Sequence, residues 1–213
     1  NDFHYKSTFN FFARCEKLSI KNFIFNPSYD VNSIELKNIA NFIKKKNFKI
    51  GLHQSYDSWK NKNKIIKEKK YIEKNLNVKI TSCRQHWLKF SWNKTWYFQS
   101  QSGLKLDTTL MFNDKIGFRA SAAICWTPFC QKVQRIENKN FQVLPTILMD
   151  SHLYDYENLN LKNIKTKIEK TLDELIAVGG QASILWHPHT LNKDYGWEEG
   201  FKYLLIYLKK YEK

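Results

Sequence analysis

The sequence predicts an α/β protein in which short apolar strands alternate with amphipathic helices over one domain of 213 residues. Short apolar runs are repeatedly followed by segments of roughly 10–18 residues with helical periodicity, which is the pattern of parallel βα units. Polar residues follow many of these separate strands, and this favours a barrel-like arrangement over an open sheet. The predicted fold is therefore a (β/α) barrel of about six to seven mostly parallel strands.

The first half of the chain gives four strands and three helices. Strands are expected at 6–12, 20–25, 48–52 and 78–82, each as a short run of apolar or β-branched residues. Helix 32–46 has apolar residues at helical spacing, with Asn32 or Ser33 as its cap. Helix 62–75 is amphipathic, and helix 94–101 stops before Gly103, a common C-terminal signal.

The second half begins with a short strand at 104–106 and an irregular segment at 117–126. Strands follow at 132–136 and 142–148. Helix 161–178 has the clearest periodicity and is closed by Gly179 and Gly180. Strand 182–186 and helix 197–208 complete the chain, and no repeat or linker-like stretch divides it. No apolar run reaches the roughly 18 residues that a membrane span needs.

The net charge is +15, from 35 Lys and Arg against 20 Asp and Glu. Such a charge is compatible with nucleic acids or acidic glycans as partners. Arginine, however, occurs only four times, and the lysines are spread over expected helix faces. We therefore predict no nucleic-acid partner. The sequence does not indicate an oligomeric state.

The four cysteines are Cys15, Cys83, Cys125 and Cys130, and no two of them form a CxxC pair. Their spacing does not match a structural zinc site. A chain of this length does not need disulfides to fold, so buried free thiols are expected. Free thiols favour a reducing compartment, and we predict a bacterial cytoplasmic location.

Polar side chains gather where expected strands end, which is where ligands and catalytic groups collect in α/β proteins. They are His53 with Asp57, Arg84 with His86, Asp107, Arg119, Asp150 with His152, and His187 with His189. Imidazoles and carboxylates bind divalent ions, and arginine binds anionic or oxygen-rich groups. The set predicts one metal-assisted hydrolytic site assembled from several strands.

Several of these residues have alternative interpretations. Asp57 lies one helical turn after His53 and is a second metal ligand, a helix cap or a surface residue. Asp150 is either catalytic or the cap of segment 151–156. The tryptophans, Trp126 among them, are expected mainly in the core, with one or two available to stack on a sugar.

The order of short motifs resembles that of the NodB-type polysaccharide deacetylases, a family of carbohydrate esterases, over about residues 6–208. The closest likeness is to a divergent branch associated with bacterial surface-polysaccharide gene clusters. The matching motifs are Ser7-Thr8-Phe9, Gly51-Leu52-His53-x-Ser55-Tyr56, Arg84-Gln85-His86, Gly103-x-x-x-Asp107-Thr108-Thr109-Leu110, Gly117-Phe118-Arg119 and Leu185-x-His187.

This resemblance implies a distorted (β/α) barrel and removal of N- or O-acetyl groups from sugars with zinc or a related divalent ion. It implies metal binding by His53 and His86, with Asp57 in the place of another histidine. It implies catalytic roles for His187 as general acid, for Arg84 in orienting the base, and for Asp107 behind the site. The expected substrate-binding residues are Arg119, Trp126 and His189.

One departure from the family pattern decides whether a catalytic or a non-catalytic function is expected. The family's first strand ends in two aspartates, and Asp2 is too close to Ser7-Thr8-Phe9 to supply them. The chain is therefore expected to be N-terminally truncated or catalytically incomplete. The leading hypothesis is a deacetylase acting on a bacterial surface polysaccharide or its precursor. The alternatives are a glycan-binding relative without catalysis and, less favoured, a basic nucleic-acid-binding protein.

Overall fold

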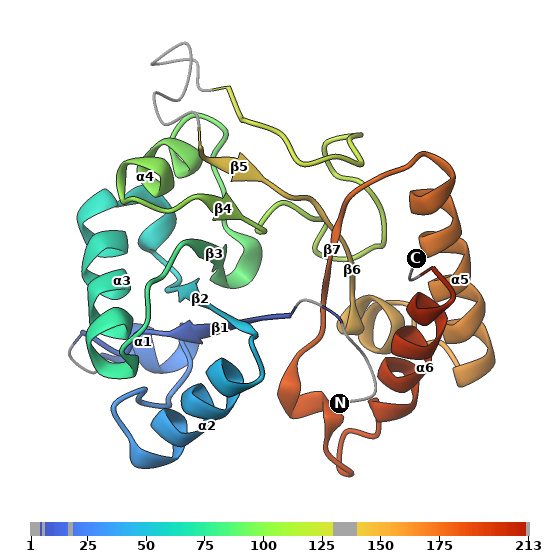
Figure 1. Cartoon of the computed structure of the whole chain (residues 1–213), viewed down its shortest axis with the longest axis horizontal. Helices are drawn as coiled ribbons and strands as arrows, with labels where there is room; N and C mark the ends of the chain where they lie inside the picture. Colours follow the sequence, from blue (N-terminus) through green and yellow to red (C-terminus); the bar gives the residue numbers. More distant parts are fainter. Residues whose placement is uncertain (1–4, 6, 17–18, 130–139, 212–213) are drawn as a thin grey trace. The chain divides into compact units, whose positions relative to one another are not determined.

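A computed structural model describes residues 5, 7–16, 19–129 and 140–211, which belong to two compact units (Figure 1). The sheet unit combines Tyr5–Thr109 with Trp126–Val143. The C-terminal unit combines Leu110–Cys125 with the described residues from Leu144 onward. The expected strand at 132–136 lies outside the described residues. The expectation of a single domain stays a prediction.

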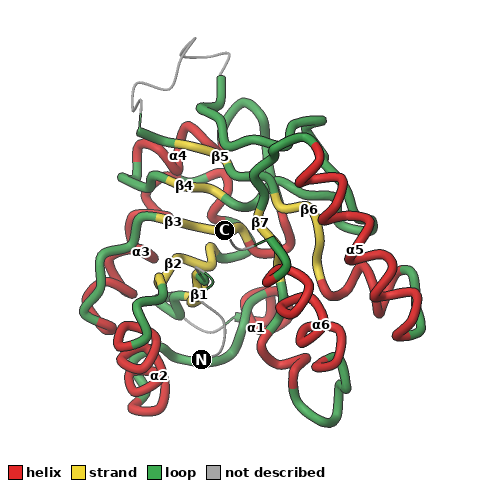
Figure 2. Tube along the Cα trace, turned by 45° about the vertical axis from the view of Figure 1, so that its right-hand side comes forward, coloured by secondary structure: helices red, strands yellow, loops and turns green. Residues whose placement is uncertain are grey.

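The sheet unit is built on a five-stranded sheet in which every strand pairs with its neighbour in sequence. The strands are β1 (Thr8–Phe12), β2 (Lys49–Gln54), β3 (Ser82–Gln85), β4 (Leu106–Asp107) and β5 (Gln142–Val143). All four pairings are parallel, and Figure 2 shows the strands in this order. The register sets Phe12 opposite His53 and His53 opposite Arg84, so residues near three strand ends are neighbours.

Helices connect these strands and bury one face each against the sheet. Helix α2 (Ile34–Lys45) begins after Ser33, whose hydroxyl accepts a hydrogen bond from the Leu36 amide. Helix α3 (Lys62–Leu76) buries Ile65, Ile72 and Leu76, and helix α4 (Thr95–Gln101) buries Trp96. In both views α3 and α4 lie along one side of the sheet (Figures 1 and 2). These three helices confirm the sequence predictions.

The expected strand at 20–25 is wrong, because this segment forms helix α1 (Ile20–Phe25). The Ser19 side chain accepts a hydrogen bond from the Asn22 amide and so starts a helical turn. Ile20, Phe23 and Ile24 are exposed on this helix, at 82%, 74% and 61%. The apolar run therefore reflects an exposed helical face and not a buried strand.

The C-terminal unit packs two long helices beside a parallel pair of strands, β6 (Thr146–Met149) and β7 (Ser183–Leu185). Helices α5 (Leu161–Ala177) and α6 (Glu198–Lys209) contribute Ile164, Ile168, Leu172 and Leu204 to a core that contains Ile147. A π-helical turn, η3 (His152–Tyr156), follows β6, and a 3₁₀ turn, η4 (Pro188–Leu191), follows β7.

Seven strands in the described residues agree with the expected number, and their pairings are parallel. The largest differences from the expected boundaries are that β3 begins only at Ser82 and that the expected strand 142–148 divides into β5 and β6 around Pro145. β1 to β5 form one sheet and β6 and β7 another, so barrel closure stays a prediction. Among the described helices, none combines the length and apolar character needed to cross a membrane.

Gly51 in the middle of β2 allows close packing between three strands. A Cβ atom at this position would clash with Asn10 Oδ1 of β1 and would lie 2.9 Å from Ser82 Oγ of β3. Asn10 is the direct partner of Gly51 in the register of β1 and β2. The glycine is therefore required by space, since it lies within a regular strand.

We expect Gly51→Ala to lower the free energy of unfolding by about 1–3 kcal/mol, because the added methyl group overpacks the sheet. Asn10→Ala in the same chain should restore part of this loss by removing the clashing amide. Denaturant unfolding of both variants measures the effect. Equal stability of Gly51→Ala and the unchanged chain would contradict the packing described.

Candidate functional site

Two histidines lie together at the carboxyl ends of adjacent strands in the sheet unit. His53 is the second-last residue of β2, and His86 directly follows β3. His53 Nε2 and His86 Nδ1 are 2.8 Å apart, and the rings are nearly perpendicular, at 79°. Parallel pairing of β2 with β3 produces this contact, and a shared functional site for these two residues stays a prediction.

An aromatic cluster lies beside this histidine pair. The Trp87 ring is 6.1 Å from the His86 ring and makes edge contacts with Phe25 and Tyr56, while Phe25 and Tyr56 stack at 4.4 Å. Trp87 and Leu88 both have left-handed backbones, with φ of 58° and 50°. Residues with side chains of this size rarely adopt such a conformation, which costs about 1–3 kcal/mol for each residue. The turn after β3 therefore stores strain beside the histidines.

Asp107 is fully buried at the end of β4 and is held by a network of donors. Its Oδ2 accepts a hydrogen bond from Trp96 Nε1 at 3.1 Å, and its Oδ1 accepts from Gln99 Nε2 at 3.1 Å and Thr109 Oγ1 at 2.5 Å. Burial raises the pKa of Asp107, although these hydrogen bonds oppose the shift. The carboxylate therefore positions α4 against β4 and is shielded from any substrate.

Arg84 is also buried, and its Nε donates to the Thr108 carbonyl at 3.1 Å. This bond ties the end of β3 to the residue after β4. Burial lowers the pKa of Arg84 to about 10. In the described residues its role is to hold the strand ends in place, and a role in orienting a catalytic base stays a prediction.

Asp57 faces a lysine rather than a metal-binding cluster. Its Oδ2 is 2.6 Å from Lys21 Nζ of α1. Partial burial opposes the shift, but the hydrogen bond and charge of Lys21 hold the Asp57 pKa below its usual value. Asp57 directly precedes the turn η1 (Ser58–Lys60), but its side chain makes no capping hydrogen bond to this turn. Of the three alternatives for Asp57, the structure shows the surface ion pair.

The His53–His86 pair offers two of the ligands that a catalytic metal needs. At 2.8 Å the two nitrogens are at hydrogen-bond distance, and they would move apart to about 3.3 Å to bind one zinc ion in tetrahedral geometry. Across the described part of the chain, no group of three or more His, Cys, Asp or Glu side chains is placed to hold an ion. The donors therefore fit two ligand positions, and binding of a metal ion stays a prediction.

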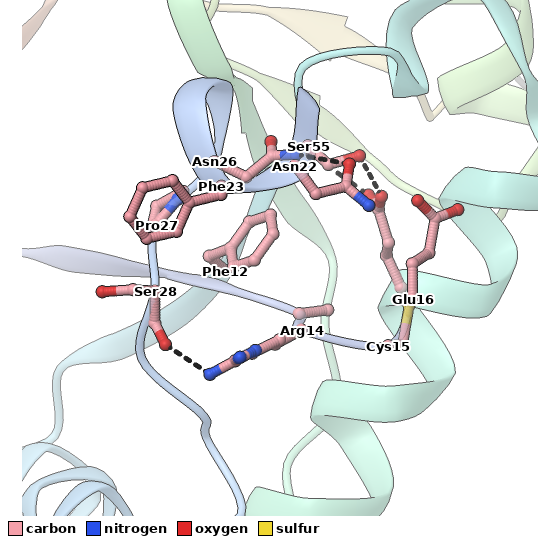
Figure 3. Close-up of a pocket in the computed structure, with 12 residues that line it drawn as sticks. Phe12, Arg14, Cys15, Glu16, Asn22, Phe23, Asn26, Pro27, Ser28 and Ser55 are labelled. Atoms are coloured by element: carbon pink, nitrogen blue, oxygen red, sulfur yellow. Dashed lines mark hydrogen bonds between the residues drawn. The ribbon is translucent and has the colours of Figure 1, made fainter. Parts of the chain in front are cut away.

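A cavity of about 220 Å³ lies at the carboxyl ends of β1 and β2 (Figure 3). Phe12, Phe23 and Pro27 form apolar walls, and Arg14 at its edge donates to the Ser28 carbonyl at 2.7 Å. Glu68 also lines the cavity.

Glu68 is 1% exposed, and hydroxyl and amide groups donate the hydrogen bonds that the structure shows to its carboxyl group. Its Oε1 accepts from the Ser55 and Ser58 hydroxyls, and its Oε2 accepts from the Ser55 amide at 3.3 Å. Burial raises the pKa of Glu68. Burial and the nearby Glu68 also raise the pKa of Cys15 to about 11, so this thiol is not an activated nucleophile.

The C-terminal unit contains a separate histidine–carboxylate pair. Asp150 directly follows β6 and is fully buried, and its Oδ1 lies 2.7 Å from His187 Nδ1. Its Oδ2 accepts hydrogen bonds from the His187 amide at 2.8 Å and from Thr190 Oγ1 at 3.0 Å. The His187 side chain is 38% exposed. A buried aspartate that orients an imidazole in this way prepares the other ring nitrogen for proton transfer.

The three expected substrate-binding residues have different surroundings. Arg119 donates to the Met111 carbonyl at 3.2 Å within the C-terminal unit. His189 is exposed, with its ring 5.5 Å from that of His187. Trp126, in the sheet unit, pairs through its backbone with Val143 and places its ring edge-on to Trp96 at 6.2 Å. Substrate binding by these residues stays a prediction.

The sequence left the role of Asp150 undecided and did not single out the buried carboxyl group of Glu68. Asp150 accepts from the Ser151 amide at 2.9 Å, as a cap would, but it also holds His187. Glu68 received no role, although its spacing from Ile65 and Ile72 places it on the buried face of α3. That spacing was the available signal.

The five parallel strands with flanking helices form an α/β fold, and the two histidines lie at the ends of adjacent strands. The chain is similar to a solved structure from Mycobacterium smegmatis described as a "putative polysaccharide deacetylase", with a TM-score of 0.59 and 15% identity. The similarity covers 87% of this chain and 63% of that one, so the matched part spans less than two thirds of the other protein. At this identity the likeness shows the fold. No family model and no curated protein sequence matches the chain.

The buried Glu68 carboxyl group gives the stability of the chain a specific pH dependence. Its pKa is raised on folding from an ordinary value of 4.5, so above that pH the unfolded chain loses this proton more readily than the folded chain. The free energy of unfolding should then fall as the pH rises, by at most about 1.4 kcal/mol per pH unit for one group.

In Glu68→Gln this contribution is absent, so its stability relative to the unchanged chain should improve from pH 4.5 upward. Denaturant unfolding at several pH values measures the difference. Glu174→Gln, at an exposed position of α5, controls for the loss of one negative charge. A constant difference between Glu68→Gln and the unchanged chain across this range would show that Glu68 is not held protonated.

Proposed function

We propose that this protein is a metal-dependent hydrolase that removes an acetyl group from a sugar. The observation that carries the proposal is the pair of facing imidazole nitrogens, 2.8 Å apart, at the carboxyl ends of adjacent parallel strands. The similarity of the fold to the Mycobacterium smegmatis structure supports a carbohydrate as the substrate class. We further propose a sugar of a bacterial surface polysaccharide or its cytoplasmic precursor.

His53 and His86 would hold a divalent ion, and zinc suits two imidazole nitrogens. Such an ion, when bound, polarises the acyl carbonyl and lowers the pKa of a coordinated water molecule. Arg84 and the Asp107 network hold the strand ends that carry the two histidines. These buried groups keep the imidazoles in position without contacting the substrate.

The Asp150–His187 pair supplies the proton transfer in this proposal. Asp150 accepts from Nδ1, which leaves Nε2 of the partly exposed ring to donate a proton. Hydrolysis forms a bond between the water oxygen and the acyl carbon and breaks the bond from that carbon to the sugar nitrogen or oxygen. The departing atom would take up a proton, for which the resemblance to the deacetylases implies His187 as the donor. The attacking water would give up a proton in exchange, and acetate is the second product.

A glycan-binding protein without catalysis is the second candidate. The specific observation in its favour is the end of β1, where Phe11, Phe12 and Ala13 are buried and no aspartate occurs between residues 6 and 16. The resemblance to the deacetylases implies two aspartates at the end of a first strand. A chain without an equivalent base would keep sugar affinity and lose turnover.

Metal content and acetate release test the proposal together. The purified chain, after incubation with zinc and removal of the excess, should hold about one ion and release acetate from N-acetylated or O-acetylated oligosaccharides. His53→Ala should lose the ion and at least about 100-fold of the activity, because even indirect supports of a metal ligand contribute 10–100-fold. Mass spectrometry and an acetate assay measure both.

Retention of the ion and of activity in His53→Ala would refute the assignment of the histidine pair. Binding of the oligosaccharide by a metal-free chain that releases no acetate would favour the second candidate.

The proton-transfer role predicts a separate loss in Asp150→Asn. An amide at this position no longer fixes the imidazole tautomer, so kcat should fall by about 10²–10⁴-fold while metal content stays unchanged. Thr190→Val removes one hydrogen bond to the Asp150 carboxylate but leaves the contact between Asp150 and the His187 ring in place. The kcat of this variant should therefore fall by less than about tenfold. Equal kcat values for Asp150→Asn and the unchanged chain would exclude this role.

A further inference from the structure

We propose that Trp87, supported by Tyr56 and Lys89, is a subsite that binds a sugar ring carrying a negatively charged substituent. This inference rests on the proposed function, because it takes the ligand to be a carbohydrate. It goes further by naming an acidic sugar as the preferred ligand. It also names the residues that select it.

Trp87 combines high exposure with a fixed position. The residue is 59% exposed, although it is one of the largest apolar side chains in the sheet unit. Its ring contacts the edges of Phe25 at 6.1 Å and Tyr56 at 6.3 Å, and these two rings support each other by stacking. A supported indole ring that is still open to solvent is suited to stacking on the apolar face of a sugar.

The backbone at this position supports a functional role for the side chain. Trp87 has φ 58° and ψ 16°, a left-handed conformation in which glycine or asparagine would be less strained. Strained backbone is concentrated at ligand-binding and catalytic sites. The ring gains little from burial in return for this conformation, since more than half of it remains exposed. Ligand contact explains both features together.

Charge over the neighbouring Tyr56 ring indicates which sugars bind. Lys89 Nζ lies 3.8 Å from the centre of the Tyr56 ring, and within the described residues it forms no ion pair. Lys21 Nζ, 5.8 Å from the same ring, is paired with Asp57. In the part of the chain that the structure describes, a carboxylate therefore balances the charge of Lys21 but not that of Lys89. A carboxylate, sulfate or phosphate on the sugar would balance it.

The size of the cluster favours a sugar over a protein partner. One open indole ring with one adjacent cation matches the dimensions of a single sugar residue. A stable protein–protein contact needs about 800 Å² on each partner. The ring of His86 lies 6.1 Å from Trp87, so a sugar held on Trp87 would carry its neighbouring substituents toward the histidine pair.

The experiment compares an acidic and a neutral oligosaccharide of equal length. Calorimetry measures binding of a hyaluronan hexasaccharide, which carries carboxylates, and of a chitin hexasaccharide, which does not. The unchanged chain should bind the acidic probe more tightly. Trp87→Ala should weaken both by at least about tenfold, because the stacking surface is lost. Lys89→Gln should weaken the acidic probe alone.

Matched variants separate this role from a structural one. Trp92 is 51% exposed and packs on Phe90 and Trp96, so Trp92→Ala removes a similar ring and should leave binding within about twofold. Lys60, whose Nζ lies 5.7 Å from the Trp59 ring, gives the control Lys60→Gln. Trp87→Gly should melt at a higher temperature than Trp87→Ala, because glycine adopts the left-handed conformation without strain.

Three results would overturn the subsite. These are no binding of either probe by the unchanged chain, equal binding by the Trp87→Ala and Trp92→Ala variants, and a dimer that Trp87→Ala dissociates. The acetate assay keeps this test distinct from that of the proposed function. Acetate release with unaltered binding by Trp87→Ala refutes the subsite alone. The expected binding pattern without acetate release refutes the hydrolase and leaves the subsite in place.

Discussion

The buried carboxylate of Asp107 determines much of the architecture around the histidine pair. A charged group without contact with solvent is strongly unfavourable unless donors surround it, and Trp96, Gln99 and Thr109 supply them. Two of these donors come from α4, so the position of that helix relative to the end of β4 is fixed by hydrogen bonds as well as by apolar packing. Cys83 Sγ donates to the same carboxylate from β3, at 3.6 Å. Replacing Asp107 with an apolar residue would leave several buried donors without partners.

A buried layer of hydrogen-bonded glutamine side chains lies behind the half-buried histidine pair at the strand ends. Gln99 bridges Asp107 to the side chain of Gln54, at 2.7 Å, and Gln85 donates to the Ser55 carbonyl at 2.6 Å. These bonds fix the last residues of β2 and β3 from behind. His53 and His86 are then presented beside this rigid layer, half-buried. Rigid support of this kind is what a metal-binding or catalytic residue requires.

The sequence allowed the parallel α/β arrangement and the His53–His86 contact to be predicted, because both follow from local patterns and the regular spacing of parallel strands. It did not allow the Asp150–His187 pair to be chosen over a simple cap, since Asp150 also directly precedes the segment 151–156 that it could cap. The helix at Ile20–Phe25 was missed because an exposed apolar helix face has the composition of a strand. The turn between β3 and α4 sets the left-handed conformation of Trp87. A tryptophan in the sequence does not predict a positive φ, so this conformation could not be foreseen.

The three carboxylates of the sheet unit that bear on the proposed site differ in how readily they can change partner. Asp107 and Glu68 are buried within sets of hydrogen bonds, so moving either would leave several donors unpaired. Asp57 is bound to an exposed lysine, in an ion pair that water and salt screen. Loss of that pair destabilises the fold little, because Lys21 remains solvated on α1. Asp57 is therefore the one of these three carboxylates that can change partner at the least cost to the fold.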